Sequence, residues 1–163
     1  MKINYKNYGT YKNKKTFQEG GKRLNKNYRK EKPFFSIITT VKNNKIKLEK
    51  TIKSLNNQKF KNFEHLIIDA GSTDGTLEII KKYDKKIDYW VSRSDKGIYY
   101  GFNDGIKLAR GDIIGIINSG DLYTQNSLMI ISKYFTEFRL DFVFGAVKKM
   151  KILFNYNPKK IHW

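Results

Sequence analysis

The 163-residue sequence predicts an α/β fold, in which a mostly parallel sheet carries helices on both of its faces. Three observations support this prediction. Short apolar runs of strand length recur along the chain, segments with helical spacing separate them, and small polar turns follow several of the runs. Neither an internal repeat nor a second globular domain is visible, so we expect one domain behind an N-terminal arm.

The N-terminal arm is distinguished by its charge. Residues 1–33 contain eleven Lys or Arg and two Glu, which leaves half of the net charge of +18 in this segment. The segment is rich in Asn, Tyr and Gly and has no sustained apolar period, which predicts a basic, extended or partly disordered arm. Pro33 marks the boundary with the domain, which we expect to cover residues 34–163.

The first half of the domain alternates between strand and helix. The run FFSIITT has the composition of a buried parallel strand, and in the following segment Leu48, Ile52 and Leu55 lie at helical spacing. A second strand and a second helix follow in the same way. The predicted elements are a strand at 34–40, a helix at 45–58, a strand at 64–70 and a helix at 76–83.

The second half of the domain repeats the alternation. Ile98, Phe102 and Ile106 are spaced four residues apart, which predicts a helix with these residues as its apolar stripe, despite Gly101 and Gly105. The last segment, DFVFGAVKKMKILFNY at 141–156, favours one or two strands arranged as an edge hairpin. The other predicted elements are a short strand at 88–92, a strand at 112–118 and a helix at 127–135.

Acidic turns follow three successive predicted strands. They are DAGSTDG, SRSDKG and NSGD, and each holds an acid, namely Asp69, Asp95 and Asp121. Because parallel strands bring their carboxyl ends to one edge of a sheet, we expect these acids to converge on a ligand there. The alternative for NSGD alone is an ordinary surface turn, since Asn, Ser, Gly and Asp are common turn residues.

A structural alternative also exists for the other two turns. Asp69 would satisfy backbone amides of its own turn, and Ser72 or Asp74 would cap the following helix. Asp95 would form an ion pair with Lys96. Taken together, the three turns favour a binding edge over three unrelated structural roles.

The order of these motifs resembles one known family. The segments FSIITTVKNN, LEKTIKSLNNQKFKNFEHLIIDAGSTDGTLEIIKKY and IDYWVSRSDKGIYYGFNDGIKLARGDIIGIINSGDLY are similar to glycosyltransferase family 2 enzymes with the GT-A fold, a Rossmann-like fold that binds a nucleotide-sugar. The resemblance extends from Phe35 to about Phe135. The stretch DKGIY and the basic lead-in EGGKRLNKNYRKEKP are most similar to bacterial polysaccharide-biosynthesis members.

The resemblance implies an inverting, metal-dependent glycosyltransferase. Its donor would be a nucleotide-diphosphate-sugar, with a UDP-sugar favoured, and its acceptor a glycan or a lipid-linked molecule. Asp121 corresponds to the carboxylate that binds a Mg²⁺ or Mn²⁺ ion bridging the diphosphate, a role suited to hard oxygen ligands. The implied nucleotide-sugar-binding residues are Thr40, Asn43, Asp69, Asp95, Lys96, Asn118 and Gly120.

The chain departs from the family pattern in two ways. Many relatives carry Asp where this chain has Ala70, Asn118 and Gly120, so the base preference is left open. Inverting transfer also needs a general base, which in relatives lies well beyond the metal motif. Here the acids after Asp121 include Glu137 and Asp141 in the last 42 residues, and neither is assigned as the base. Relative to the family, the fold is predicted to be C-terminally truncated.

Two other functions remain open. One is a non-catalytic or truncated module that binds a nucleotide-sugar without transferring it. The other, less favoured, is nucleic-acid binding through Tyr5, Tyr8 and Tyr11 of the basic arm, although the chain has no recognised nucleic-acid motif and the same arm would suit an anionic membrane. We therefore expect no nucleic-acid partner.

The remaining composition bears on location and metal chemistry. The chain has no cysteine and no apolar stretch of membrane-spanning length, and its N-terminus lacks a signal peptide. These features predict a cytoplasmic protein, with peripheral contact at the inner face of the membrane as a second option. His65 lies within a strand pattern and His162 near the terminus, so we expect neither to form a metal site.

Overall fold

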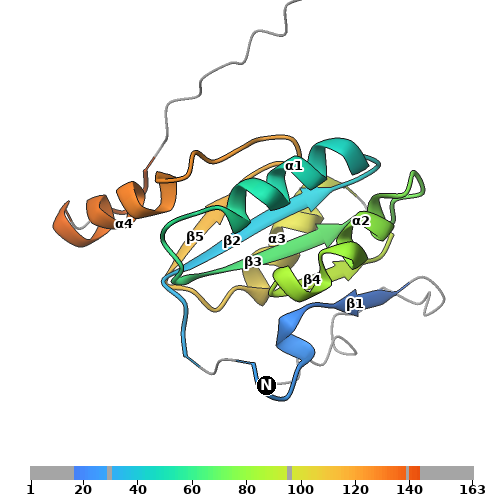
Figure 1. The fold of residues 1–163 in the computed structure, drawn as a ribbon, viewed down its shortest axis with the longest axis horizontal. Helices are drawn as coiled ribbons and strands as arrows, with labels where there is room; N and C mark the ends of the chain where they lie inside the picture. The colour runs from blue at the N-terminus through green and yellow to red at the C-terminus, as the bar shows by residue number, and fades with distance from the viewer. Residues whose placement is uncertain (1–16, 29–30, 95–96, 139, 144–163) are drawn as a thin grey trace, which may run out of the picture.

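The computed structural model describes residues 17–28, 31–94, 97–138 and 140–143, and it contains a five-stranded sheet (Figure 1). The strands are ordered β1-β4-β3-β2-β5, and all neighbours run parallel except β1, which is antiparallel to β4. This arrangement confirms the predicted α/β fold with a mostly parallel sheet. The strands are β1 (Gln18–Gly20), β2 (Phe35–Val41), β3 (Phe63–Asp69), β4 (Tyr89–Ser92) and β5 (Ile113–Ile116).

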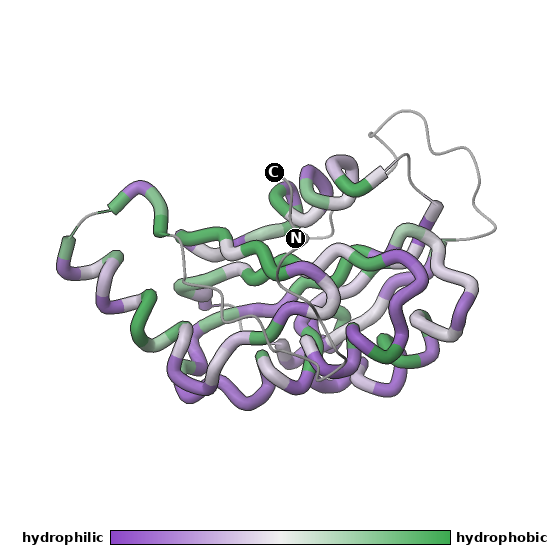
Figure 2. The backbone as a smooth tube through the Cα atoms, turned by 90° about the horizontal axis from the view of Figure 1, so that it is seen from above, coloured by the Kyte–Doolittle hydropathy of each residue, from purple (hydrophilic) through white to green (hydrophobic). Residues whose placement is uncertain are grey.

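Helices cover both faces of the sheet, as the alternation of elements predicted (Figures 1 and 2). Three helices pack on one face through two apolar clusters, and α3 packs on the other face against Ile38, Leu66 and Ile68. The helices are α1 (Lys45–Asn56), α2 (Thr76–Lys82), α3 (Ile98–Leu108) and α4 (Ser127–Phe138), with 3-10 turns η3 (Lys22–Leu24) and η4 (Asp84–Lys86). In the described part of the chain, no helix has both the length and the apolarity to cross a bilayer.

The buried face of α3 differs from the predicted stripe. Ile98 is 53% exposed and Ile106 is 44% exposed, whereas Gly101 and Gly105 are buried. A Cβ at Gly105 would lie 2.4 Å from Cγ2 of Ile38 on β2, so only glycine allows the helix to approach the sheet this closely. The prediction of a helix was correct, but the choice of its buried face was wrong because glycine supplies close packing without apolar side-chain atoms.

Part of the N-terminal segment belongs to the sheet. The sequence predicted no strand before residue 34, yet β1 pairs with β4, and Arg23 forms an ion pair of 2.5 Å with the fully buried Glu64 of β3. Nζ of Lys22 lies 2.9 Å from Asp88, just before β4. Residues 1–16, and residues 144–163 where the hairpin was predicted, lie outside the described residues, and the boundary at Pro33 stays a prediction.

Candidate functional site

The carboxyl ends of the parallel strands meet at one edge of the sheet. Val41 at the end of β2 pairs with Asp69 at the end of β3, and Asp69 pairs with Ser92 at the end of β4. The amide of Ile117, directly after β5, donates to the carbonyl of Ile38 at 3.0 Å. The next residue, Asn118, therefore leaves the sheet beside the end of β2, and the loops after these strands share one edge.

Asn43 joins the first two loops of this edge. Its amide donates to Oγ of Ser72 at 2.8 Å, and the Ser72 hydroxyl donates to the carboxylate of Asp69 at 2.5 Å. In return, Oδ1 of Asn43 accepts the amide of Thr73 at 2.8 Å. Asn43 has a φ of +50°, in the left-handed region that Asn tolerates better than most residues. The chain thus turns sharply after β2 in order to reach the loop after β3.

The carboxylate of Asp69 is fully buried and is committed to this edge. Besides the Ser72 hydroxyl, it accepts the Ser72 amide at 3.1 Å and the Ser92 hydroxyl at 2.6 Å. These bonds satisfy the carboxylate inside the protein, which a buried charge requires. The structural alternative, that Asp69 satisfies its own turn, is therefore confirmed, and its side chain joins the ends of β3 and β4 and, through Ser72, the loop after β2.

The Asn43 amide, the Ser72 hydroxyl and the Asp69 carboxylate form one hydrogen-bonded chain, and a second chain through the Thr76 hydroxyl lies beside it. The amide of Asn44 donates to Oγ1 of Thr76 at 3.0 Å, and the Thr76 hydroxyl donates to Asp74 at 2.5 Å. Asp74 also accepts the amides of Thr76 at 3.0 Å and Lys45 at 3.3 Å, at the starts of α2 and α1. The hydroxyl of Thr76 in particular holds the pKa of Asp74 below its ordinary value. Of the two predicted capping residues, Asp74 rather than Ser72 contacts the helix start.

Thr51 of α1 holds the NSGD turn. Its buried Oγ1 accepts the amide of Gly120 at 2.8 Å and donates to the carbonyl of Asp121 at 3.0 Å. The side-chain amide of Asn44 donates to the carbonyl of Ser119 at 3.0 Å, so the loop after β2 touches this turn as well. Gly120 has a φ of +114°, which other residues adopt only with strain. Gly120 therefore bends the backbone of this turn.

The NSGD turn leaves three oxygen groups open. The side chains of Asn118 and Asp121 are exposed, and the Asp121 carboxylate has no hydrogen bond or ion pair with any described residue. Oγ of Ser119 is buried without a hydrogen-bond partner in the same part of the chain. Hydroxyl, amide and carboxylate oxygens are suitable ligands for Mg²⁺ or Mn²⁺ and for the water around them. These residues therefore fit a hard divalent ion.

The chain supplies few ligands for such an ion. Within the described ranges, no group of three or more His, Cys, Asp or Glu side chains is arranged to hold a metal. Asp121 would be the sole carboxylate, and phosphate oxygens and water would have to complete the coordination shell. A site of this kind fits a metal that arrives with a diphosphate better than a metal held by the protein alone.

The structure brings most of the predicted site residues to one edge. Asp95 and Lys96 lie outside the described residues, so their position stays a prediction. Sequence reasoning missed Asn44, Thr51 and Ser92, which position the loops. Thr51 carried a recognisable signal, because it is a polar residue within the apolar stripe of α1. The residues placed together are Thr40, Asn43, Asp69, Asn118, Gly120 and Asp121.

His65 lies on β3 away from this edge and is buried. Its Nε2 is 3.0 Å from Oγ1 of Thr39 on the neighbouring strand, so it is packed and hydrogen-bonded. Burial lowers the pKa of His65 to about 4. The imidazole is therefore neutral at physiological pH and contributes to the core of the sheet.

Known proteins are similar to this chain in sequence and in fold. The chain is 31% identical over 100 residues to a GalNAc(5)-diNAcBac-PP-undecaprenol beta-1,3-glucosyltransferase of Campylobacter jejuni, a match that covers 59% of this chain and 32% of the relative. The structure of S. aureus TarS 1-349 in complex with UDP-GlcNAc superimposes with a TM-score of 0.59 at 26% identity, over 64% of this chain and 32% of that one.

A third comparison bears on the fold alone. The mannosyltransferase PcManGT from Pyrobaculum calidifontis, in complex with GDP-Man and Mn2+, has a TM-score of 0.60 at 19% identity, over 66% of this chain and 34% of that one. The chain spans less than half of the length of the first curated relatives it matches, namely 36% to 40% of each relative. The family model described as Glycosyl transferase family 2 matches residues 36–163. The chain therefore belongs to glycosyl transferase family 2.

Proposed function

We propose that this chain forms the donor-binding part of an inverting, metal-dependent glycosyltransferase, which takes a sugar from a UDP-sugar for a glycan or lipid-linked acceptor in polysaccharide biosynthesis. The observation that carries the proposal is the open Asp121 carboxylate, placed by Thr51 beside loops that Asp69 and Asp74 hold together. Family membership and the UDP-GlcNAc complex of TarS support the choice of a nucleotide-sugar.

Different residues of the edge would contact different parts of the donor. Asn43, together with Thr40 at the end of β2, would contact the nucleoside, and Asn118 and Gly120 would lie beside the ribose and diphosphate. Asp69 would act as a positioning residue, because its carboxylate is buried among the donors of Ser72 and Ser92. Asp95 and Lys96 are proposed as further donor contacts on the family resemblance alone.

The metal ion would be held by Asp121, with the Asn118 amide and the Ser119 hydroxyl near it. When bound, a divalent cation neutralises the charge that develops on the diphosphate leaving group. The contribution of the protein is to hold the turn that carries Asp121 in a fixed conformation. The bonds from Thr51 to Gly120 and Asp121 hold the backbone of the turn, so that the carboxylate is presented towards the ligand without a competing partner.

The general base would come from another part of the protein or from another chain. Of the described residues after the NSGD turn, the acids are Glu137 and Asp141, and both are exposed. Glu137 lies near the end of α4. This helix starts beside the C-terminal end of α1, where the Leu128 amide donates to the Gln58 side chain, and neither acid is assigned as the base. A donor-binding module that transfers no sugar is therefore the second candidate function.

Isothermal titration of UDP in the presence of Mn²⁺, Mg²⁺ or EDTA tests donor binding. We expect binding to require a divalent ion, and Asp121→Asn to weaken it by about tenfold or more, since a hydrogen bond or ionic contact to a charged group is worth about 1.5–3 kcal/mol. Asp141→Asn is the matched control because this acid is exposed elsewhere. Equal binding by the Asp121→Asn variant and the parent would reject the proposal.

Sugar transfer separates the two candidate functions. The chain is incubated with a UDP-sugar that it binds and with glycan and lipid-linked acceptors, and free UDP is measured together with the glycosylated product. Product formation that Asp121→Asn abolishes establishes a transferase. Metal-dependent donor binding without product, for every acceptor, establishes the binding module.

A further inference from the structure

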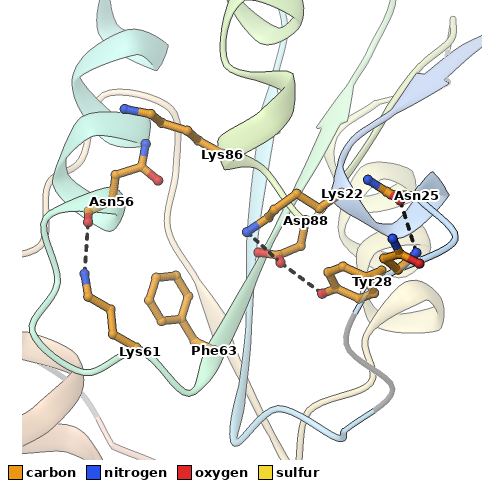
Figure 3. A pocket seen from close by; sticks show the side chains of 9 residues that line it. Lys22, Asn25, Tyr28, Asn56, Lys61, Phe63, Lys86 and Asp88 are labelled. Carbon is orange, nitrogen blue, oxygen red and sulfur yellow. Dashed lines mark hydrogen bonds and ion pairs between the residues drawn. The ribbon is translucent and has the colours of Figure 1, made fainter.

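A second hollow opens at the opposite edge of the sheet, where the strands begin (Figure 3). Its volume is about 470 Å³, which falls within the range of small-molecule binding sites. Three separate segments of the chain line it: residues 22–28 of the N-terminal segment, residues 56–63 at the end of α1 and the start of β3, and residues 86–88 before β4. The candidate donor site uses none of these residues.

The charge of this pocket is positive. Lys22, Lys61 and Lys86 line it together with one carboxylate, that of Asp88. Asp88 is nearly fully buried and already satisfied, because it accepts the Tyr28 hydroxyl at 2.9 Å and the His65 amide at 2.8 Å, and lies 2.9 Å from Nζ of Lys22.

The other two lysines are open to a ligand. Nζ of Lys61 contacts only the carbonyl of Asn56, at 3.3 Å, and neither Lys61 nor Lys86 has an ion pair with a described residue. Both lysines therefore line the hollow without a counter-charge among the described residues. Both ammonium groups would attract a negatively charged ligand, whereas a neutral ligand would form no ion pair with either.

The neutral part of the lining suits a carbohydrate. Asn25, Asn27 and Asn56 line the pocket, and a side-chain amide both donates and accepts hydrogen bonds, as a sugar hydroxyl does. Figure 3 shows the ring of Phe63 between Lys61 and Asp88. This ring is partly buried and packs against the apolar cluster that contains Phe35 and Leu55, so it supports this part of the pocket wall.

We propose that this pocket binds an anionic saccharide, a sugar unit that carries carboxylate or phosphate groups. Its charge would pair with Lys61 and Lys86, and its hydroxyls with the asparagine amides. The site lies at the opposite end of the strands from Asp121, and it does not depend on the proposed transfer reaction.

The lining favours a saccharide over the other anions. Stacking of successive nucleotide bases requires several open aromatic rings. The second ring of the pocket, Tyr28, lies 5.0 Å from the guanidinium of Arg110 and donates its hydroxyl to Asp88, so it is already engaged. A membrane surface would be met by apolar side chains on a convex face, whereas this site is a hollow lined mainly by Lys and Asn.

Titration calorimetry with three oligosaccharides tests the proposal on the full chain. The probes are a galacturonic acid hexamer, which carries carboxylates, a pentamannose phosphate, and neutral maltohexaose. We expect the acidic probes to bind about tenfold more tightly than the neutral one, because hydrogen bonds to charged groups are worth about 1.5–3 kcal/mol. The tighter of the two acidic probes identifies the charged group that the site prefers. Equal binding of all three probes would overturn the proposal.

A charge-matched pair of variants locates the site. The double variant Lys61→Gln, Lys86→Gln should weaken acidic-probe binding by about tenfold, whereas Lys81→Gln, Lys133→Gln should change it by less than about twofold, because these lysines are exposed elsewhere. Similar losses in both variants would mean that the high net charge alone attracts the probe, and no loss in either would place the site elsewhere. Both results would overturn the proposal.

Competition identifies the occupant. We expect UDP with Mn²⁺ to leave acidic-probe binding unchanged, and displacement by UDP would move the probe to the donor site. A single-stranded oligonucleotide and vesicles of phosphatidylglycerol are titrated in parallel. If these bind through Lys61 and Lys86 while the saccharides do not, the pocket serves a nucleic acid or a membrane instead.

Discussion

The two edges of the sheet use their acids differently. At the amino edge, Glu64 and Asp88 are buried and bonded to cationic and aromatic side chains from distant parts of the chain, such as Arg23 and Tyr28. At the carboxyl edge, Asp69 and Asp74 are bonded to hydroxyls and backbone amides, and Asp121 is left open.

This difference separates stability from ligand binding. At the amino edge, the buried acids Glu64 and Asp88 have arginine or lysine counter-charges inside the protein. At the carboxyl edge, neutral hydroxyl groups hold the loops together, so no lysine or arginine is needed for this purpose. The Asp121 carboxylate has no partner among the described residues. We therefore expect substitutions of the buried acids at the amino edge to act mainly on folding, and those near Asp121 to act mainly on binding.

The largest effect on stability is expected for Glu64→Gln. This change leaves the buried guanidinium of Arg23 and the partly buried one of Arg110 without their charge partner, which should lower the free energy of unfolding by about 3–5 kcal/mol. Urea unfolding measures it. Glu49→Gln is the matched control, since Glu49 also contacts two cations but is far more exposed, and it should give a smaller loss. Equal losses would contradict the contrast between the two edges.

The pH dependence should also arise near the amino edge. Burial lowers the pKa of His65 from 6.5 to about 4, so the unfolded chain takes up the proton first as the pH falls. The stability contributed by the neutral imidazole is complete above pH 6.5, and it decreases down to pH 4 by up to about 3 kcal/mol. Unfolding at a series of pH values should show a shallower slope for His65→Gln, and an unchanged slope would refute this origin.

A moderate effect is expected for Thr51→Val, which conserves shape but removes the hydroxyl between Gly120 and Asp121. The unfolding free energy should fall by about 1–2 kcal/mol, and metal-dependent UDP binding should weaken because the NSGD turn loses its support. Thr136→Val removes an exposed hydroxyl on α4 and is the control for both measurements. A variant that binds UDP as well as the control would show that Thr51 does not position the turn.

The smallest effect on stability is expected for Asp121→Asn. The carboxylate is exposed and has no partner in the described part of the chain, so thermal and urea unfolding should stay within about 0.5 kcal/mol of the parent. The same variant should lose metal-dependent UDP binding. A large loss of stability would mean that Asp121 is a structural acid, and the contrast between the edges would then disappear.

Much of the fold was predictable because its signals are local. The apolar runs before Asp69 and Asp121 identified the parallel strands, and parallel geometry then required their ends to meet. The buried face of α3 was not predictable from apolar spacing, since Gly105 packs through the absence of a side chain. Strand β1 was missed because three residues carry no period, and its pairing partner, β4, is distant in sequence.

The candidate site was predictable only in its location. The turn residues indicated which edge would bind a ligand, but the partners of each acid depend on side chains from other loops. Asp69 and Asp121 look alike in sequence, as single acids after apolar strands. Ser72 and Ser92 surround the first, whereas the side chain of the second is exposed and has no partner among the described residues. No pattern along the chain distinguishes these two environments.

The paired hydroxyl chains through Ser72 and Thr76 have a consequence for affinity. They fix consecutive amides of Asn43 and Asn44, so the two loops are already ordered when the protein has folded. The conformational entropy of these loops is lost during folding and is not subtracted again when a ligand arrives. A preorganised rim of this kind should bind a ligand with little change in its backbone, at a rate set by diffusion.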